Sequence, residues 1–268
     1  MQKKWLILLL LLLILGIYPG CTSGVSPDTD EPPDDPALAT TKRVVMFELF
    51  EGSACTLCAA VHPDMLNLRK DYGLDELVIL EEYSLDGAYT GWKVSGVLKR
   101  WFEYQNLCGD KSGYPDAYFN GLNQTVHQEQ RGYVNYKAAI EKELAKPAKI
   151  AISATYSVNG RVVNINGNIT NISSDVLSNL AVEAMVYENS VYSEYRGYNV
   201  DHVLRDIISD EEPEDEKLIA NFAPGDNYEF SLTSTSLNNV HDMNNIHVVV
   251  YVRAATQEIL QALYVEVE

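Results

Sequence analysis

Basic residues are scarce in this chain of 268 residues, which has 20 Lys and Arg against 38 Asp and Glu and a formal net charge of −18. Nucleic-acid binding needs clustered cations against the phosphates, so this balance argues against DNA or RNA as a partner. Cysteine is scarce too: four in a chain of this length are too few for a fold held together by disulfides. The sequence also lacks the motifs of a phosphate-binding loop, a dinucleotide site or a Ser-His-Asp triad, and we expect no cofactor.

The N-terminus has the pattern of a targeting segment. An apolar run from Trp5 to Ile17 follows two lysines. The run is short for a membrane-spanning helix and typical of a signal peptide, which we predict over residues 1–20. Cys21 follows a glycine, and this pair resembles a bacterial lipoprotein cleavage site, which implies lipid attachment at Cys21. A plain secretory signal or an uncleaved anchor is the alternative; in each case the chain faces an extracytoplasmic space where disulfides persist.

The rest of the chain divides into three parts by composition. Residues 21–41 are rich in Pro, Asp, Ser and Thr without apolar periodicity, which predicts a solvated acidic tether. Residues 42–146 alternate between strand and helix patterns, which predicts an α/β domain. Residues 147–268 contain about seven short strand patterns, and Asn159-Gly160 is a strong hairpin signal. We therefore predict an all-β domain of the Ig-like sandwich type for this last part.

The expected elements have definite positions in both parts. In the α/β part we expect strands at 44–50 and 78–83, helices at 57–71, 92–107 and 133–145, and two further strands, one after Pro115 and one at 125–127. In the all-β part we expect strands at 150–158, 161–170, 181–188, 203–208, 228–233, 246–254 and 260–266.

Cys55 and Cys58 lie between the first expected strand and the first expected helix. Cysteines at positions i and i+3 share one face of a helix's first turn, so their sulfurs can meet. The helix N-terminus offers unpaired N–H groups and partial positive charge, which favours a thiolate at Cys55. This arrangement suits thiol–disulfide exchange, with Cys55 as the attacking thiolate and Cys58 as the resolving thiol. A purely structural disulfide is the alternative.

A second motif extends this interpretation. Pro115 precedes a short aromatic strand that ends in an Asn-Gly turn. Strand, Cys-x-x-Cys, helix and a later proline before a strand together resemble the thioredoxin fold. The resemblance implies that the Tyr114–Pro115 bond is cis and packs beside the disulfide. Tyr114 and Pro115 would then shape an edge on which a substrate peptide can pair as an added strand; an ordinary turn proline is the alternative.

A closer resemblance joins the two halves. Glu48-Leu49-Phe50 before the Cys55–His62 segment, followed by 202–205 and 258–262, resembles the Omp28-related outer-membrane lipoproteins. Members of that family combine a thioredoxin-like domain with a C-terminal β-sandwich. The resemblance implies a cell-envelope location and leaves the activity open.

The motif departs from thioredoxin in its surroundings. The place of the buried acid in the preceding strand falls on Leu49, and Glu48 would point to the opposite face under strand alternation. A proton acceptor for Cys58 is therefore not evident from the sequence. His62 lies four residues after Cys58 on the same helical face, so Cys55, Cys58 and His62 could hold a soft ion such as Cu(I) or Zn²⁺ as a distant alternative. We expect Cys108 to be a buried small apolar residue.

Three functions remain open. The first is thiol–disulfide exchange on extracytoplasmic protein thiols and disulfides, in a protein held to the membrane by its lipid anchor. The second is a non-enzymatic surface or binding module whose disulfide only stabilises the fold. The third and weakest is delivery of a soft metal ion through Cys55, Cys58 and His62.

Overall fold

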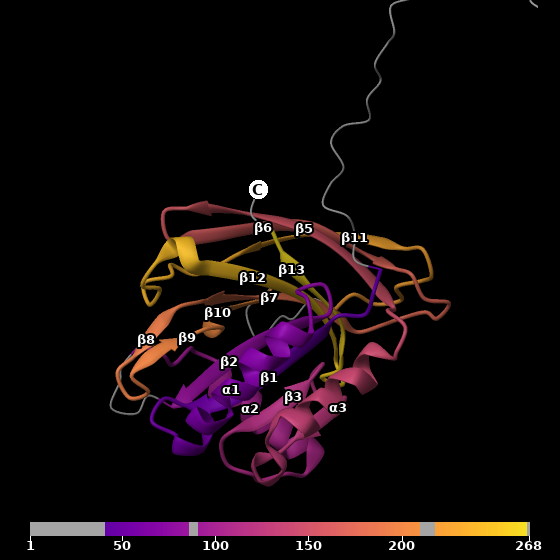
Figure 1. Ribbon diagram of the computed structural model, residues 1–268. Coiled ribbons are helices and arrows are strands. Elements are labelled where there is room, and N and C mark those ends of the chain that lie inside the picture. Colours follow the sequence, from indigo (N-terminus) through magenta and orange to yellow (C-terminus); the bar gives the residue numbers. More distant parts are fainter. Residues whose placement is uncertain (1–40, 86–90, 210–217, 267–268) are drawn as a thin grey trace, which may run out of the picture. The chain divides into compact units, whose positions relative to one another are not determined.

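The computed structural model describes residues 41–85, 91–209 and 218–266 (Figure 1). The predicted signal peptide, Cys21 and all of the predicted tether except its last residue lie outside these ranges. The described residues belong to a single unit, Pro36–Glu268. Among them, no helix combines the length and the apolar character needed to cross a membrane.

The first half has the predicted order of elements. These are β1 (Val45–Gly52), α1 (Thr56–Asp71), β2 (Leu77–Leu85), α2 (Val97–Cys108), β3 (Asp116–Phe119), β4 (Gln124–Val126), the short 3-10 helix η1 (Gln128–Gln130) and α3 (Tyr133–Leu144). Strand β1 pairs in parallel with β2 and antiparallel with β3, and β3 pairs antiparallel with β4. The order β2-β1-β3-β4, with helices between the strands, is thioredoxin-like, as the sequence predicted.

Helix α2 begins later than expected, at Val97 rather than at residue 92. Gly96 precedes it with φ +92°, in the left-handed region that favours glycine. This conformation does not continue a right-handed helix, so the helix starts at the next residue.

The second half is built of strands. These are β5 (Ile150–Asn159), β6 (Val162–Asn171), β7 (Leu180–Glu188), β8 (Val191–Ser193), β9 (Tyr198–Val200), β10 (Val203–Ser209), β11 (Asn227–Thr233), β12 (Ile246–Ala254) and β13 (Ile259–Val265), with a 3-10 turn η2 (Met243–Asn245) before β12. The seven predicted strands are confirmed. The two-stranded hairpin of β8 and β9 was not predicted.

One mixed sheet of eight strands runs through both halves, in the order β13-β12-β7-β10-β2-β1-β3-β4. The halves join where β10 pairs in parallel with β2, at Val203 and Glu81. Strands β11, β6 and β5 form a separate sheet of three strands. The division of the chain at residue 147 stays a prediction, while the hydrogen-bonded sheet is continuous across it.

Because side chains alternate between the two faces of a strand, the sheet packs an apolar cluster on each face. Phe47 and Leu49 of β1 face α1 and α3, whereas Met46 and Phe50 face α2. Helix α2 also covers β7 and β12, where its Trp101 shares a cluster with residues from both strands.

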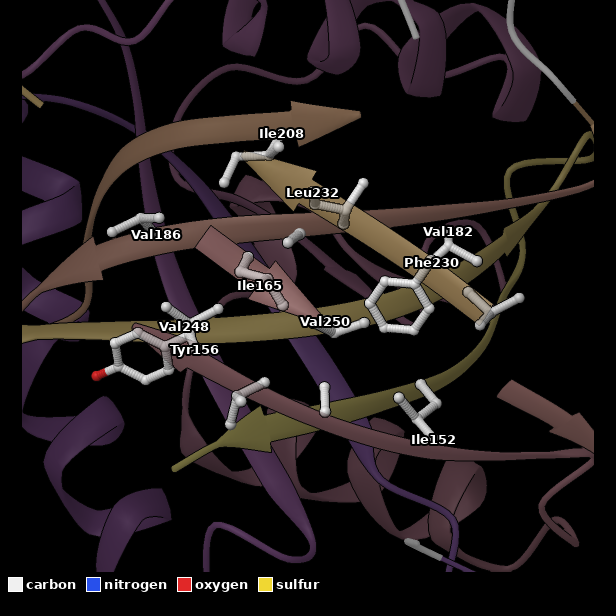
Figure 2. Packing of buried hydrophobic residues seen from close by; sticks show 14 of the residues in the cluster. Ile152, Tyr156, Ile165, Val182, Val186, Ile208, Phe230, Leu232, Val248 and Val250 are labelled. Atoms are coloured by element: carbon white, nitrogen blue, oxygen red, sulfur yellow. The ribbon is translucent and has the colours of Figure 1, made fainter. Parts of the chain in front are cut away.

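The opposite face of β7 and β12 is covered by the three-stranded sheet (Figures 1 and 2). Figure 2 shows Phe230 and Leu232 of β11 beside Val182 of β7 and Val250 of β12. The C-terminal half is therefore a packed pair of β-layers, one of which also belongs to the sheet of the first half.

Candidate redox site

Cys55 and Cys58 form a disulfide with their Cα atoms 5.2 Å apart. Cys55 is the N-cap of α1: its backbone is extended and its Sγ accepts a hydrogen bond from the Cys58 N–H at 3.1 Å. Cys58 is fully buried and Cys55 is partly exposed. Cys55 is therefore the more accessible residue of the pair, while Cys58 is shielded in the first turn of the helix.

The Tyr114–Pro115 peptide bond is cis, as the resemblance to thioredoxin implied. Gly52, at the end of β1, brings this loop to the disulfide. A Cβ placed on Gly52 would lie 3.6 Å from Cys55 Cβ and 3.7 Å from Tyr114 Cδ2, so both residues border the same point. The Tyr114 ring stacks on Trp101 at 4.3 Å and its hydroxyl bonds to Ser84. These contacts fix the ring beside the disulfide.

The unpredicted hairpin of β8 and β9 completes the site from the second half of the chain. Tyr195, in the turn between its strands, shares a hydrogen bond of 3.0 Å with Thr56, the residue between the cysteines and next to Cys55. The ring of Tyr198 packs against His62 of α1 at 4.8 Å. Because these contacts involve the first two turns of α1, the redox motif is supported by residues about 140 positions away in sequence.

Buried charges lie beneath the start of α1. Arg196, from the same hairpin, is almost fully buried and pairs with Glu51 of β1 and with Glu81 of β2, the latter at 3.4 Å. Tyr83 donates a hydrogen bond of 2.8 Å to Glu81, and His62 Nδ1 lies 3.7 Å from a Glu81 oxygen. One arginine thus faces two carboxyl groups in the interior.

The two carboxyls differ in their tendency to ionise. Burial raises the pKa of Glu51 to about 7, against the opposing effect of Arg196. Burial also disfavours a charge on Glu81, but His62 and Arg196 outweigh it and lower the pKa of that group. The site therefore holds one firmly ionised carboxylate and one carboxyl that changes its charge near neutral pH.

Glu51 is the acid that the sequence did not reveal. The predicted orientations of its neighbours are confirmed: Leu49 packs toward α1 and α3, while Glu48 lies on the other face, where Arg100 Nε donates to it at 2.6 Å. Glu51 is two residues beyond Leu49, so it shares the face toward α1. Strand alternation alone could have placed Glu51 on the face toward α1. Its counter-ion Arg196 could not be predicted, because only the fold brings the two residues together.

Two other expectations have different outcomes. Cys108 is exposed, so its prediction as a buried residue is wrong. The last buried residues of α2 are Tyr104 and Gln105, and Cys108 stands at the end of the helix beyond them. The soft-metal alternative stays a prediction: the two sulfurs are bonded to each other, and His62 faces Glu81.

Comparisons with known proteins support the fold. No family model matches the chain, and no curated protein matches it. Among solved structures, HBP35 of Porphyromonas gingivalis matches with a TM-score of 0.61 at 13% identity, over 84% of this chain and 76% of that one. A domain of the outer membrane lipoprotein Omp28 of Porphyromonas gingivalis matches at 14% identity over 45% of this chain and 89% of that one, with a TM-score of 0.29. The match to HBP35 shows a likeness of fold.

Proposed function

We propose that this protein exchanges thiols and disulfides with extracytoplasmic proteins, with Cys55 as nucleophile and Cys58 as resolving thiol. The observation that carries the proposal is the unequal pair at the start of α1, with a partly exposed Cys55 and a fully buried Cys58. The Cys58 N–H bond to Cys55 Sγ and the helix N-terminus both stabilise negative charge at Cys55.

The reaction balances without a further reagent. In the reduced protein the Cys55 thiolate attacks a substrate disulfide, forms a mixed disulfide and expels one substrate thiolate. Cys58 loses its proton and attacks Cys55 Sγ, which expels the second substrate thiolate and closes the Cys55–Cys58 bond. The substrate gains two electrons and the protein loses them; the reverse sequence oxidises a substrate dithiol.

Glu51 is suited to accept the proton of Cys58. It lies two residues beyond Leu49, on the face of β1 toward α1, the helix whose first turn contains Cys58. Its pKa of about 7 places its change of charge near the working pH, which is where a general base is effective. Arg196 is then a positioning residue that keeps Glu81 ionised and limits the rise in the pKa of Glu51.

The substrate edge and the location complete the proposal. Tyr114 and Cys55 both lie close to Gly52, and Tyr114 with Pro115 would shape an edge on which an extended peptide could pair as an added strand. The predicted lipoprotein signal supports a cell-envelope protein that is anchored by lipid at Cys21. The packing of β5, β6 and β11 on β7 and β12 supports the interpretation of the C-terminal half as an Ig-like sandwich.

A trapping experiment tests the exchange. A Cys58→Ser variant should hold a mixed disulfide between Cys55 and a cysteine-containing peptide, whereas Cys55→Ser should hold none under the same conditions. Both variants also carry Cys108→Ser, because Cys108 is an exposed free thiol that can itself form a mixed disulfide with the peptide. Cys108→Ser alone is the control, since it keeps the closed Cys55–Cys58 disulfide and should trap nothing. Equal trapping by both motif variants, or none by either, would favour the binding module with a structural disulfide.

A further inference from the structure

A group of three ligating side chains lies apart from the disulfide, at the far side of the Pro115 loop. Asp110 follows α2, Asp116 opens β3 directly after Pro115, and His127 follows β4. Their ligating atoms all lie within 4.8 Å of one another. His127 Nδ1 is 2.8 Å from Asp116 Oδ1 and 3.0 Å from Asp110 Oδ2. Three positions that are 6 and 11 residues apart along the chain therefore direct one nitrogen and two carboxylate oxygens to a common point.

These distances lie close to those of a metal site. Bonds of about 2.0–2.2 Å from a tetrahedral metal ion to nitrogen or oxygen put neighbouring ligand atoms about 3.4 Å apart, so the three side chains need to separate by only about half an ångström to admit an ion. If His127 Nδ1 carries a hydrogen, that hydrogen is the one donor shared by the carboxylates of Asp110 and Asp116. A divalent ion bound to Nδ1 instead of the hydrogen would compensate the negative charges of both carboxylates, which a single hydrogen does not.

Surrounding groups hold the carboxylates in this orientation. Asp116 is fully buried, and its other oxygen accepts hydrogen bonds from Trp101 Nε1 at 2.7 Å and from the Tyr118 hydroxyl at 2.9 Å. Asp110 Oδ1 accepts from the Ser112 hydroxyl at 2.9 Å, and the Oδ2 that faces His127 also accepts from the backbone N–H of Ser112 at 2.9 Å. Outer contacts of this kind orient the ligands of metal sites.

The site is also open to solvent. The side chains of Asp110 and His127 are 20% and 23% exposed, so an ion can enter and keep bound water. We propose that Asp110, Asp116 and His127 bind one divalent transition-metal ion, of which Zn²⁺ is the best match. One imidazole nitrogen with two carboxylate oxygens is a ligand set that Zn²⁺ binds well. Ca²⁺ and Mg²⁺ bind sites made of oxygen ligands, so we do not expect this site to prefer either of them.

Binding would fasten the Pro115 loop between two other segments. Asp116 belongs to that loop, and Gln128, the neighbour of His127, donates a hydrogen bond to the carbonyl of Tyr114. An ion that joins Asp110, Asp116 and His127 therefore ties the end of α2 and the end of β4 to the loop beside the disulfide. We expect Zn²⁺ to raise the melting temperature because it binds the folded chain.

The test is equilibrium dialysis of the oxidised full chain, free of affinity tags, against Zn²⁺ or Mg²⁺. A Cys108→Ser background removes the free thiol, and the disulfide keeps the other pair from binding. We expect one Zn²⁺ per chain, no binding of Mg²⁺ at the same concentration, and a loss of at least tenfold in Zn²⁺ affinity in Asp110→Asn and in His127→Gln. His241→Ala is the matched control, since that histidine lies 3.5 Å from a single carboxylate, Glu188.

The outcomes separate the alternatives. Circular dichroism establishes that each variant is folded, and the gain in melting temperature with Zn²⁺ should vanish in Asp110→Asn and His127→Gln alone. Absence of binding at 1 mM Zn²⁺ would show a plain ion-pair cluster and overturn the proposal. Undiminished binding in both variants would place the ion elsewhere and overturn it as well. Neither result depends on the exchange activity.

Discussion

Replacing Glu51 with Gln should change how the stability of the protein depends on pH. The carboxyl of Glu51 is buried, and its pKa is raised from an ordinary value of 4.5 to about 7. A group with a raised pKa in the folded state binds its proton more tightly there than in the unfolded chain. Its contribution to stability is therefore fully present below pH 4.5 and is lost as the pH rises through 7.

The size of the effect follows from the shift. A difference of one pKa unit corresponds to 1.36 kcal/mol, so the wild-type protein should lose about 3 kcal/mol from this group by pH 8. Glutamine cannot ionise and fits nearly the same space, so Glu51→Gln should lack this loss. Relative to the wild type, the variant should gain about 2 to 3 kcal/mol between pH 5 and pH 8.

Urea denaturation at several pH values measures this difference. Glu229→Gln is the control, because Glu229 is an exposed carboxyl on β11 and its replacement should leave the pH dependence unchanged. Parallel curves for the wild type and Glu51→Gln across this pH range would refute the assignment of Glu51 as the carboxyl that titrates near neutral pH.

Three further substitutions test the packing at the candidate site and elsewhere in the fold. Arg196→Met should destabilise the fold by about 3–5 kcal/mol in urea denaturation, since it leaves two buried carboxyls without their cation. Phe230→Ala should cost about 3–5 kcal/mol in the same assay, because its ring fills the cluster between the two β-layers. Gly121→Ala should cost more than about 1 kcal/mol, because φ is +64° and the new Cβ would lie 1.9 Å from the carbonyl oxygen of Gln257. A cost below about 0.5 kcal/mol, within the range of ordinary surface substitutions, would contradict the stated reason in each case.

Most helices and strands could be predicted, because the residues that determine each of them are close together in the sequence. The apolar run before Cys55 and the helical spacing after it lie within 30 residues, and the observed β1 and α1 agree with them. The Asn159-Gly160 turn likewise joins β5 and β6 in register. In these segments each residue's propensity and its pattern of burial point the same way.

The candidate site was less accessible to the sequence because half of it comes from distant segments. The hairpin that bears Tyr195 and Arg196 has strands of only three residues, flanked by Asn, Ser and Gly, which reads as a polar loop. Only the contacts of Tyr195 and Tyr198 with α1 show that these tyrosines belong to the candidate site. Arg196 is 145 residues from Glu51, and no periodicity links charges at that distance. Asp110, Asp116 and His127 lie within 17 residues of one another, but they belong to three different segments whose spacing predicts no contact, and they converge only in the folded chain.

The central claim is tested most directly by the reduction potential of the Cys55–Cys58 pair, measured by equilibration with glutathione and dithiothreitol. Exchange proteins span about −120 to −270 mV, and we predict a value in this range together with fast exchange that is lost in Cys55→Ser. A potential below about −300 mV, with a disulfide that resists reduction until the chain unfolds, would contradict exchange and leave a structural disulfide in a binding module.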